Sequence, residues 1–163
     1  MPAMATDRVS RLDRYERVRV QLEALFARCA EPIARMATIA ALAHAKTPGV
    51  SWTGFYLLRG DRLQIGPYQG PLACMDLAPH TGVCWASIDR NEPVIVPDVH
   101  AFPGHIACDP RSLSEIVIPL RDGQGRAVGV LDLDSARLGH FDDTDRAGLV
   151  PIVALVYGAP ALE

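Results

Sequence analysis

The feature that most constrains the fold is a change of hydrophobic period along the chain. Apolar residues recur at helical spacing from Leu12 to Cys29, and a second stripe of this kind starts at Pro32. After residues 47–49 (Thr-Pro-Gly) the pattern becomes that of strands, and a long helix returns only after Asp142. Helices at both ends of a run of strands predict an α+β fold, with a central antiparallel sheet of about six strands and the N- and C-terminal helices packed on one face.

The pattern also places the individual elements. Strands are expected at 50–58, 62–65, 73–77, 94–96, 115–120 and 126–134, and a short helix at 81–90. Residues 122–125 (Asp-Gly-Gln-Gly) are a hairpin signal between the last two strands, and residues 98–112 are expected to form a long loop. Asp142 can cap the last helix, which runs towards Tyr157 and is expected to kink at Pro151.

Composition limits the class of protein. The 163 residues predict a single domain over 1–163, with residues 1–11 as a flexible N-terminus. A hydrophobic content of 49% excludes disorder, and a net charge of -3 gives no reason to expect a nucleic-acid partner. No run is apolar enough to span a membrane, and no hydrophobic region follows the first residues as in a secretory signal. We therefore expect a cytoplasmic protein, in which cysteines are more often catalytic or metal-binding than structural.

Three of the four cysteines suggest redox chemistry. Cys74, Cys84 and Cys108 follow the spacing Cys-x9-Cys-x23-Cys, and the chain contains no CxxC pair of the kind that zinc sites usually use. Well-separated thiols are instead typical of a nucleophile with partners that close a transient disulfide on it. Cys29 lies in a helical stretch and fits an ordinary core position. A zinc protein using these three cysteines and His105 is the weakest alternative.

Acidic residues are expected to share one face of the sheet. Asp132 and Asp134 are two apart on an expected strand and point the same way, whereas Leu131 and Leu133 point to the opposite layer. Glu115 opens a strand just after the Cys108 loop. Carboxylates on such apolar strands are costly if buried alone, so they predict a cation or a proton-accepting ligand between them. The alternative is that they are solubility charges on an edge strand.

Aromatic residues complete the expected pocket. Trp52 and Tyr56 share one face of their strand, and Gly54 between them is expected to leave an open slot for a small ligand. The alternative is that both rings belong to the core. Taken together with the cysteines and the acids, the pattern favours a small pocket with an aromatic wall, an acidic wall and a thiol. His105 can lower the pKa of Cys108 if it is a cation, or hydrogen-bond within its loop.

Eight short motifs in this region resemble a known family. They are Trp52-Thr-Gly-Phe-Tyr56, Gly66-Pro-Tyr-Gln-Gly70, Ala73-Cys74, Gly82-Val-Cys84, Val96-Pro-Asp98, Pro103-Gly-His-Ile-Ala-Cys-Asp109, Ser114-Glu-Ile-Val-Ile-Pro119 and Gly129-Val-Leu-Asp-Leu-Asp134. From about residue 50 to 145 the chain resembles the free methionine-(R)-sulfoxide reductases, which are stand-alone GAF-domain enzymes. A general GAF domain shares the fold but not the three cysteines. Trp85 and Pro151 depart from the family pattern.

The resemblance implies roles for the cysteines. Cys108 matches the catalytic cysteine, Cys74 the main resolving cysteine, and Cys84 the third cysteine of the set. In the implied reaction the Cys108 thiolate attacks the sulfoxide sulfur and becomes a sulfenic acid. Cys74 then condenses with it to a disulfide, which an external dithiol such as thioredoxin reduces. No metal or organic cofactor is required.

The resemblance also implies how the substrate is held. Trp52 and Tyr56 match the aromatic residues around the methyl sulfoxide end, and Glu115, Asp132 and Asp134 match the carboxylates that hold the substrate and polarise the sulfoxide. A carboxylic acid in a desolvated, like-charged cluster has a raised pKa and can donate the proton that the leaving oxygen needs. Free methionine (R)-sulfoxide carries an ammonium group, which accounts for several acids in one pocket.

Two matters stay open at this point. A GAF domain can also be a non-catalytic sensor of a small ligand, although a sensor has no need of three placed thiols. The oligomeric state is undecided between a monomer and a homodimer, and so is the choice of Cys74 or Cys84 as the dominant resolving thiol.

Overall fold

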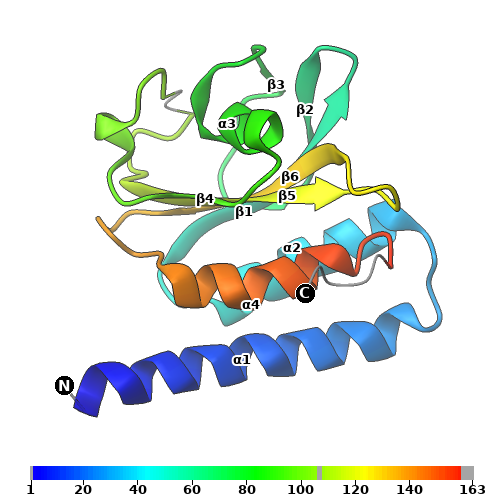
Figure 1. Cartoon of the computed structure of the whole chain (residues 1–163), viewed down its shortest axis with the longest axis vertical. Coiled ribbons are helices and arrows are strands. Elements are labelled where there is room, and N and C mark those ends of the chain that lie inside the picture. The colour runs from blue at the N-terminus through cyan, green and yellow to red at the C-terminus, as the bar shows by residue number, and fades with distance from the viewer. Residues whose placement is uncertain (1, 106–107, 159–163) are drawn as a thin grey trace.

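A six-stranded antiparallel sheet divides the molecule into two layers (Figure 1). The computed structural model describes residues 2–105 and 108–158. The helices are α1 (Pro2–Phe26), α2 (Pro32–Lys46), α3 (Gly82–Arg90) and α4 (Asp143–Ala154), with a 3-10 helix η1 (Val99–Ala101). The strands are β1 (Val50–Arg59), β2 (Arg62–Gln69), β3 (Asp76–Leu77), β4 (Val94–Val96), β5 (Ser114–Arg121) and β6 (Ala127–Ser135). This arrangement confirms the expected α+β fold.

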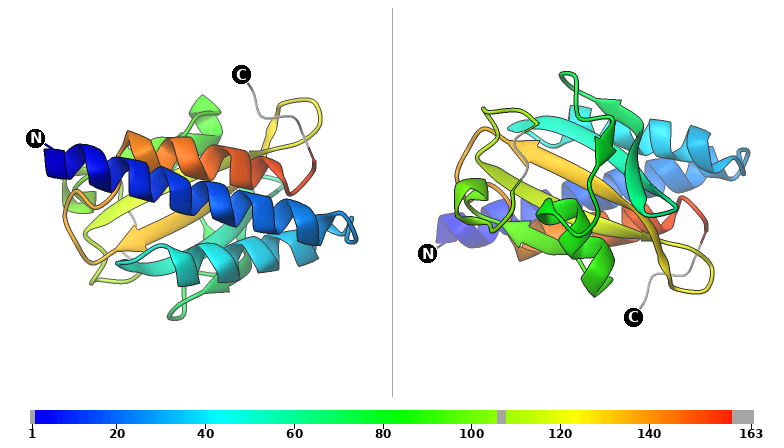
Figure 2. Two further views of the ribbon diagram at one scale, coloured as in Figure 1. Left: turned by 90° about the horizontal axis from the view of Figure 1, so that it is seen from below. Right: turned by 90° about the horizontal axis from the view of Figure 1, so that it is seen from above.

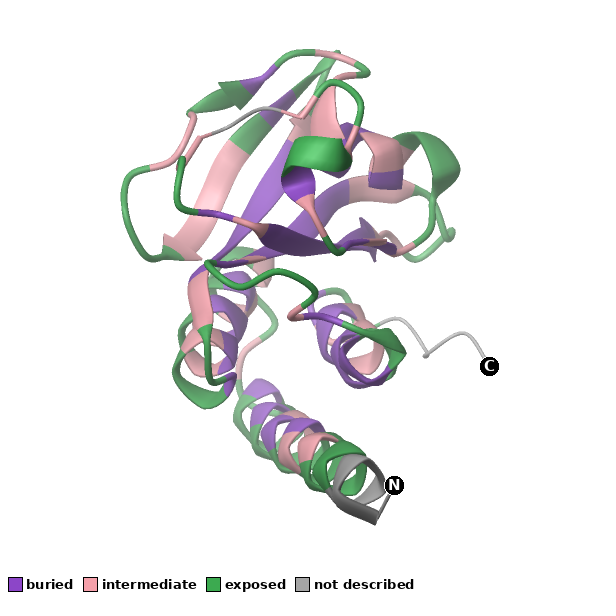
Figure 3. Cartoon of the chain, turned by 90° about the vertical axis from the view of Figure 1, so that its left-hand side faces the viewer, coloured by how far each residue is buried: buried purple, intermediate pink, exposed green. Residues whose placement is uncertain are grey.

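The sheet brings distant parts of the sequence together. Its strand order is β3-β2-β1-β6-β5-β4, so β1 pairs with β6 although a large part of the chain separates them. The central strands β1, β5 and β6 are rich in β-branched, leucine and aromatic residues and are largely buried on both faces. Figure 3 shows this burial along the sheet and on the inward sides of the helices.

Three helices cover one face of the sheet. Views from both sides show α1, α2 and α4 below the sheet and α3 above it (Figures 1 and 2). Phe55, Leu131 and Leu133 project from the sheet into this helical layer and are fully buried there. The layer is apolar and closely packed, and it supplies the main core of the domain.

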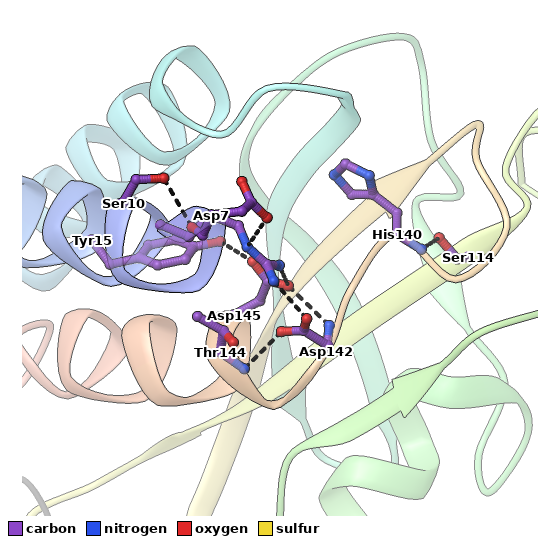
Figure 4. A network of polar contacts seen from close by, with 9 residues as sticks. Asp7, Ser10, Tyr15, Ser114, His140, Asp142, Thr144 and Asp145 are labelled. Carbon is purple, nitrogen blue, oxygen red and sulfur yellow. Dashed lines mark hydrogen bonds and ion pairs between the residues drawn. The ribbon is translucent and has the colours of Figure 1, made fainter. Parts of the chain in front are cut away.

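A polar network fixes α1 against α4 (Figure 4). The Tyr15 hydroxyl donates to Asp145 Oδ1 at 2.8 Å, and Arg11 pairs with Asp145 at 3.0 Å and with Asp142 at 2.6 Å. Asp142 and Asp145 also form a capping box at the start of α4. Burial opposes ionisation of Asp142, but the hydrogen bonds from Arg11 and Thr144 and the charge of Arg11 together outweigh it and lower the pKa of that carboxyl to about 2.

Several boundaries differ from those expected. The first helix begins at Pro2 rather than Leu12, so residues 2–11 of the segment expected as a flexible N-terminus are helical, and Arg11 is tied to α4. The third strand is shorter than expected, and η1 lies within the expected loop 98–112. Pro151 lies inside α4 without ending it. Among the described residues no helix is both long and apolar enough to cross a membrane.

Candidate active site

Strand register brings the predicted acids and aromatic residues onto the face of the sheet opposite the three-helix layer. Trp52 of β1 lies opposite Asp134 of β6, which in turn lies opposite Glu115 of β5. Because side chains alternate along a strand, Asp132 shares this face, while Leu133 belongs to the helical core. The expected separation of the aspartates from the leucines is therefore confirmed, and Glu115 joins the aspartates from the neighbouring strand.

The three carboxyl groups form a buried cluster. Glu115 and Asp132 are each only 6% exposed, and Asp134 is half-buried. Burial first, and then repulsion from Asp134, raises the pKa values of both Glu115 and Asp132 well above their usual range. Burial also raises the pKa of Asp134 to about 7, although a hydrogen bond from Ser112 opposes this rise. The cluster therefore holds protons near neutral pH, as a proton donor to a leaving oxygen must.

Cys84 lies against this cluster. Its Sγ donates to Asp132 Oδ2 at 3.6 Å, and burial raises the pKa of the thiol well above its usual value. Cys84 is therefore held as a neutral thiol rather than as a thiolate. The other oxygen, Asp132 Oδ1, is buried without a hydrogen-bond partner among the described residues. A buried acceptor of this kind can accept a hydrogen bond from a protonated neighbour such as Glu115 or from a polar group of a ligand.

The other two predicted cysteines are joined. Cys74, in the loop between β2 and β3, forms a disulfide with Cys108, and their Cα atoms are 5.8 Å apart. The expectation that these two residues come within disulfide reach is confirmed. The pairing also removes two of the four ligands of the zinc alternative, since a disulfide sulfur is not a thiolate. Cys84 and Cys29 are free thiols.

His105 borders the pocket beside the acids. Its Nδ1 lies 4.0 Å from Glu115 Oε2. Burial, followed by repulsion from His100, lowers the pKa of His105 below its usual value. The structure therefore disfavours the expectation that His105 is a cation that activates Cys108.

The two predicted aromatic residues hold the loop that carries Cys74. Trp52 Nε1 donates to the carbonyl of Pro71 at 3.1 Å, and the Tyr56 hydroxyl donates to the carbonyl of Cys74 at 3.1 Å. The Trp52 and Tyr56 rings stack with their centroids 5.9 Å apart. The Tyr68 ring also stacks with Trp52, with centroids 5.5 Å apart. The aromatic wall thus lines the pocket and positions one of the redox cysteines.

Gly54 has a different role from the one expected. A side chain at Gly54 would overlap the Trp52 ring and Tyr68, so these residues fill the space beside it. The prediction of an open ligand slot over Gly54 is wrong. The glycine is needed because the Trp52 ring lies across its own strand.

The pocket lies between the sheet, α3 and the two loops joined by the disulfide. It has a cavity volume of about 50 Å³. The residues that define its chemistry are Trp52, Tyr56, Cys84, Cys108, Glu115, Asp132 and Asp134. All the predicted site residues except Cys74 therefore line one pocket, and Cys74 is bonded to one of them.

Within the described part of the chain, one group of donors could hold a metal ion. Single donor atoms of Cys84, Glu115 and Asp132 lie within 4.8 Å of one another. A thiol and two carboxyl groups are acceptable ligands for zinc, but the same atoms suit an ammonium group and shared protons. Metal analysis of the purified protein separates these possibilities.

Comparisons with known proteins decide the family. The chain matches the GAF domain family over residues 25–157. It is 44% identical over 122 residues to the free methionine-R-sulfoxide reductase of Escherichia coli (strain K12), which covers 75% of this chain and 73% of that relative. The chain belongs to the free methionine-R-sulfoxide reductase family.

Solved structures of this reductase family have the same fold. The X-ray structure of free methionine-R-sulfoxide reductase from Neisseria meningitidis in complex with its substrate has a TM-score of 0.83 and 40% identity, and covers 88% of this chain and 86% of that one. The reduced form of the enzyme from Staphylococcus aureus has a TM-score of 0.84 and 36% identity, and covers 88% and 93%. The Neisseria meningitidis structure contains that enzyme's substrate, which is the strongest external support for a ligand pocket in this fold.

Sequence reasoning missed some residues of this reductase fold. Ser112, which is buried and hydrogen-bonds Asp134, lies in a loop without a recognisable pattern. Tyr68, which stacks on Trp52, could have been found from strand alternation. It is two positions from Gly66, so both share one face of the strand that pairs with the strand of Trp52. Trp85 is buried and donates from Nε1 to the carbonyl of Leu77 at 3.2 Å.

Proposed function

We propose that this protein reduces free L-methionine (R)-sulfoxide to methionine, with Cys108 as the nucleophile. The observation that carries the proposal is the Cys74–Cys108 disulfide beside a buried cluster of three carboxyl groups. Family membership supports the same reaction, because the relatives from Escherichia coli and Neisseria meningitidis are free methionine-R-sulfoxide reductases. A non-catalytic sensor would use the pocket but would not need the redox pair.

The reaction begins on the sulfoxide sulfur. The Cys108 thiolate attacks this atom, and the sulfoxide oxygen is transferred to Cys108 as a sulfenic acid while the substrate leaves as methionine. The step consumes one proton. Asp134, whose pKa of about 7 is near neutral pH, is half-buried at the pocket and is suited to donate it.

The second step closes the observed disulfide. The Cys74 thiol condenses with the sulfenic acid, which forms the S–S bond and releases one water molecule. Tyr56 assists this step by holding the carbonyl of Cys74, so the resolving thiol stays within reach of Cys108. An external dithiol such as thioredoxin then returns both cysteines to thiols and is itself oxidised to a disulfide.

The acids also account for the choice of the free amino acid. An ammonium group among Glu115, Asp132 and Asp134 would relieve their mutual repulsion and would occupy the unpartnered Asp132 Oδ1. A methionine sulfoxide residue inside a peptide has an uncharged amide at this position and gains none of this.

The test is a turnover assay with matched substrates. Consumption of dithiothreitol is followed with the R and S epimers of free methionine sulfoxide and with N-acetyl-methionine (R)-sulfoxide. We expect turnover of the free R epimer, with the S epimer and the N-acetyl compound at least about tenfold slower. Absence of turnover with the free R epimer would overturn the proposal, and equal rates with the N-acetyl compound would show that the acids do not bind the amine.

A further inference from the structure

The loop between β2 and β3 presents two apolar side chains beside the disulfide. Leu72 is 88% exposed and Met75 is 69% exposed, and both values exceed those of the other exposed large hydrophobic residues that the structure describes, of which Leu138 is next at 61%. Single exposed apolar residues are common on protein surfaces. Here, by contrast, two such residues lie within four positions of each other, on either side of a redox cysteine, which suggests a function for their exposure.

Hydrogen bonds to the backbone of this loop account for the exposure of the two side chains. Three of its backbone carbonyls are held from the sheet side. Pro71 accepts from Trp52 Nε1 at 3.1 Å, Cys74 from the Tyr56 hydroxyl at 3.1 Å, and Met75 from the amide of Ile65 at 2.9 Å. Because the backbone is fixed from below, the side chains of Leu72 and Met75 remain on the outer surface around Cys74.

We propose that Leu72 and Met75 form the docking contact for the protein dithiol that reduces the Cys74–Cys108 disulfide, with attack at Cys74 Sγ. The proposal rests on the proposed function, which requires an external dithiol in every cycle. The disulfide itself identifies the occupant, since the partner must bring a thiolate to Cys74, which is half-buried and lies between Leu72 and Met75 in the sequence. A reductant with an apolar rim around its dithiol would bury both of them on contact.

The chemistry of the exchange is balanced. One thiolate of the reductant attacks Cys74 Sγ, the Cys74–Cys108 bond breaks, and Cys108 leaves as a thiolate. The second thiol of the reductant then attacks the mixed disulfide and releases Cys74. The reductant becomes a disulfide, two electrons enter the enzyme, and Cys108 is ready for the next sulfoxide.

The test uses the oxidised protein without any sulfoxide, so it does not depend on turnover. The rate constant for reduction of the disulfide is measured with reduced thioredoxin and with dithiothreitol, for the wild type and for Met75→Ser. Met75 is the decisive position because Leu72 also borders the pocket. Leu25→Ser, at a residue that is 51% exposed on α1 in the opposite layer, is the matched control.

We expect Met75→Ser to slow reduction by thioredoxin about five- to tenfold, because the lost contact weakens the encounter, and to leave the rate with dithiothreitol unchanged. Met75→Leu should restore most of the rate, and Leu25→Ser should behave as the wild type. Equal rates with thioredoxin for Met75→Ser and wild type would overturn the proposal. So would an equal fall with both reductants, because it would place the effect on the disulfide itself.

Two further measurements decide the site of attack and the identity of the occupant. A thioredoxin that lacks its second cysteine should be trapped on Cys74, and trapping on Cys108 would overturn the assignment of the attacked sulfur. Sedimentation of Met75→Ser should match that of the wild type. A dimer that this substitution dissociates would show that the residue belongs to a subunit interface instead. These results can be interpreted even if the sulfoxide assay described above fails, because none of these measurements uses the substrate.

Discussion

The two faces of the sheet use the same strands for opposite purposes. Towards α1, α2 and α4, the strands present Phe55, Leu131 and Leu133, which are buried among apolar helix residues. Towards α3, neighbouring positions of the same strands present Tyr56 and Asp132, in a layer that also buries Glu115 and a free thiol. The helical face stabilises the fold, and its stability allows the other face to hold buried acids that oppose folding.

The largest effect is expected from removing the Cys108 thiol, which lines the pocket on the acidic face of the sheet. Cys108→Ser should abolish sulfoxide reduction, by at least about a thousandfold, because a hydroxyl cannot replace the thiolate. The unfolding transition should remain cooperative. Cys29→Ser is the matched control and should keep full activity. Cys29 is half-buried in the link between α1 and α2, and not in a helical core position as the sequence pattern predicted. Substantial turnover by Cys108→Ser would remove Cys108 from its role.

Adjacent residues of β6 test the two faces directly. Asp134→Asn should lower kcat by about 10²–10⁴, as expected for loss of a general acid, with stability kept or raised. Leu133→Ala should instead lower the free energy of unfolding by about 2–5 kcal/mol and leave kcat of the folded protein nearly unchanged. Activity assays and urea titrations of both variants make the comparison. An equal loss of stability in both would contradict the division of roles.

A smaller effect should follow from loosening the resolving loop. Tyr56→Phe removes the hydrogen bond to the Cys74 carbonyl and should slow disulfide closure roughly 2- to 10-fold, the usual worth of one neutral hydrogen bond. The sulfenic acid should then be captured in larger yield by a dimedone probe. Tyr68→Phe keeps the stack on Trp52 and is the control. An unchanged trapping yield would contradict a positioning role for Tyr56.

The smallest expected effect concerns stability and pH. Asp134 has a folded-state pKa of about 7, above the value of about 4 for an unfolded aspartate. Its contribution to stability is therefore complete below about pH 4 and is lost as the pH rises through about 7. Between pH 5 and 8 the disulfide-bonded wild type should lose stability relative to Asp134→Asn. Asp134→Asn also removes the repulsion that raises the pKa values of Glu115 and Asp132, which adds to the difference in the same direction. His105 and His140, whose pKa values are lowered, act in the opposite sense but are common to both proteins. Parallel stability curves would contradict the raised pKa.

Much of this division could be predicted from the sequence, because strand alternation alone separates Asp132 and Asp134 from Leu131 and Leu133. The placement of Glu115 with these aspartates came from the family resemblance, since alternation alone does not give the register of β5 against β6. The pairing of Cys74 with Cys108 spans 34 residues and came from the family resemblance rather than from spacing.

Other features depend on contacts that no local pattern encodes. The early start of α1 is supported by ion pairs between Arg11 and α4, more than a hundred residues away. The filled space over Gly54 depends on how the Trp52 ring turns across its strand. The exposure of Leu72 and Met75 follows from hydrogen bonds to the backbone of their loop.

The most direct test of the central claim is a single turnover without reductant. The protein is fully reduced, freed of reductant and mixed with excess free methionine (R)-sulfoxide, and the methionine formed and the disulfides present are then measured. We predict one methionine per protein chain, together with one Cys74–Cys108 disulfide and an unmodified Cys84. Formation of no methionine, or of methionine with a disulfide that excludes Cys108, would contradict the account.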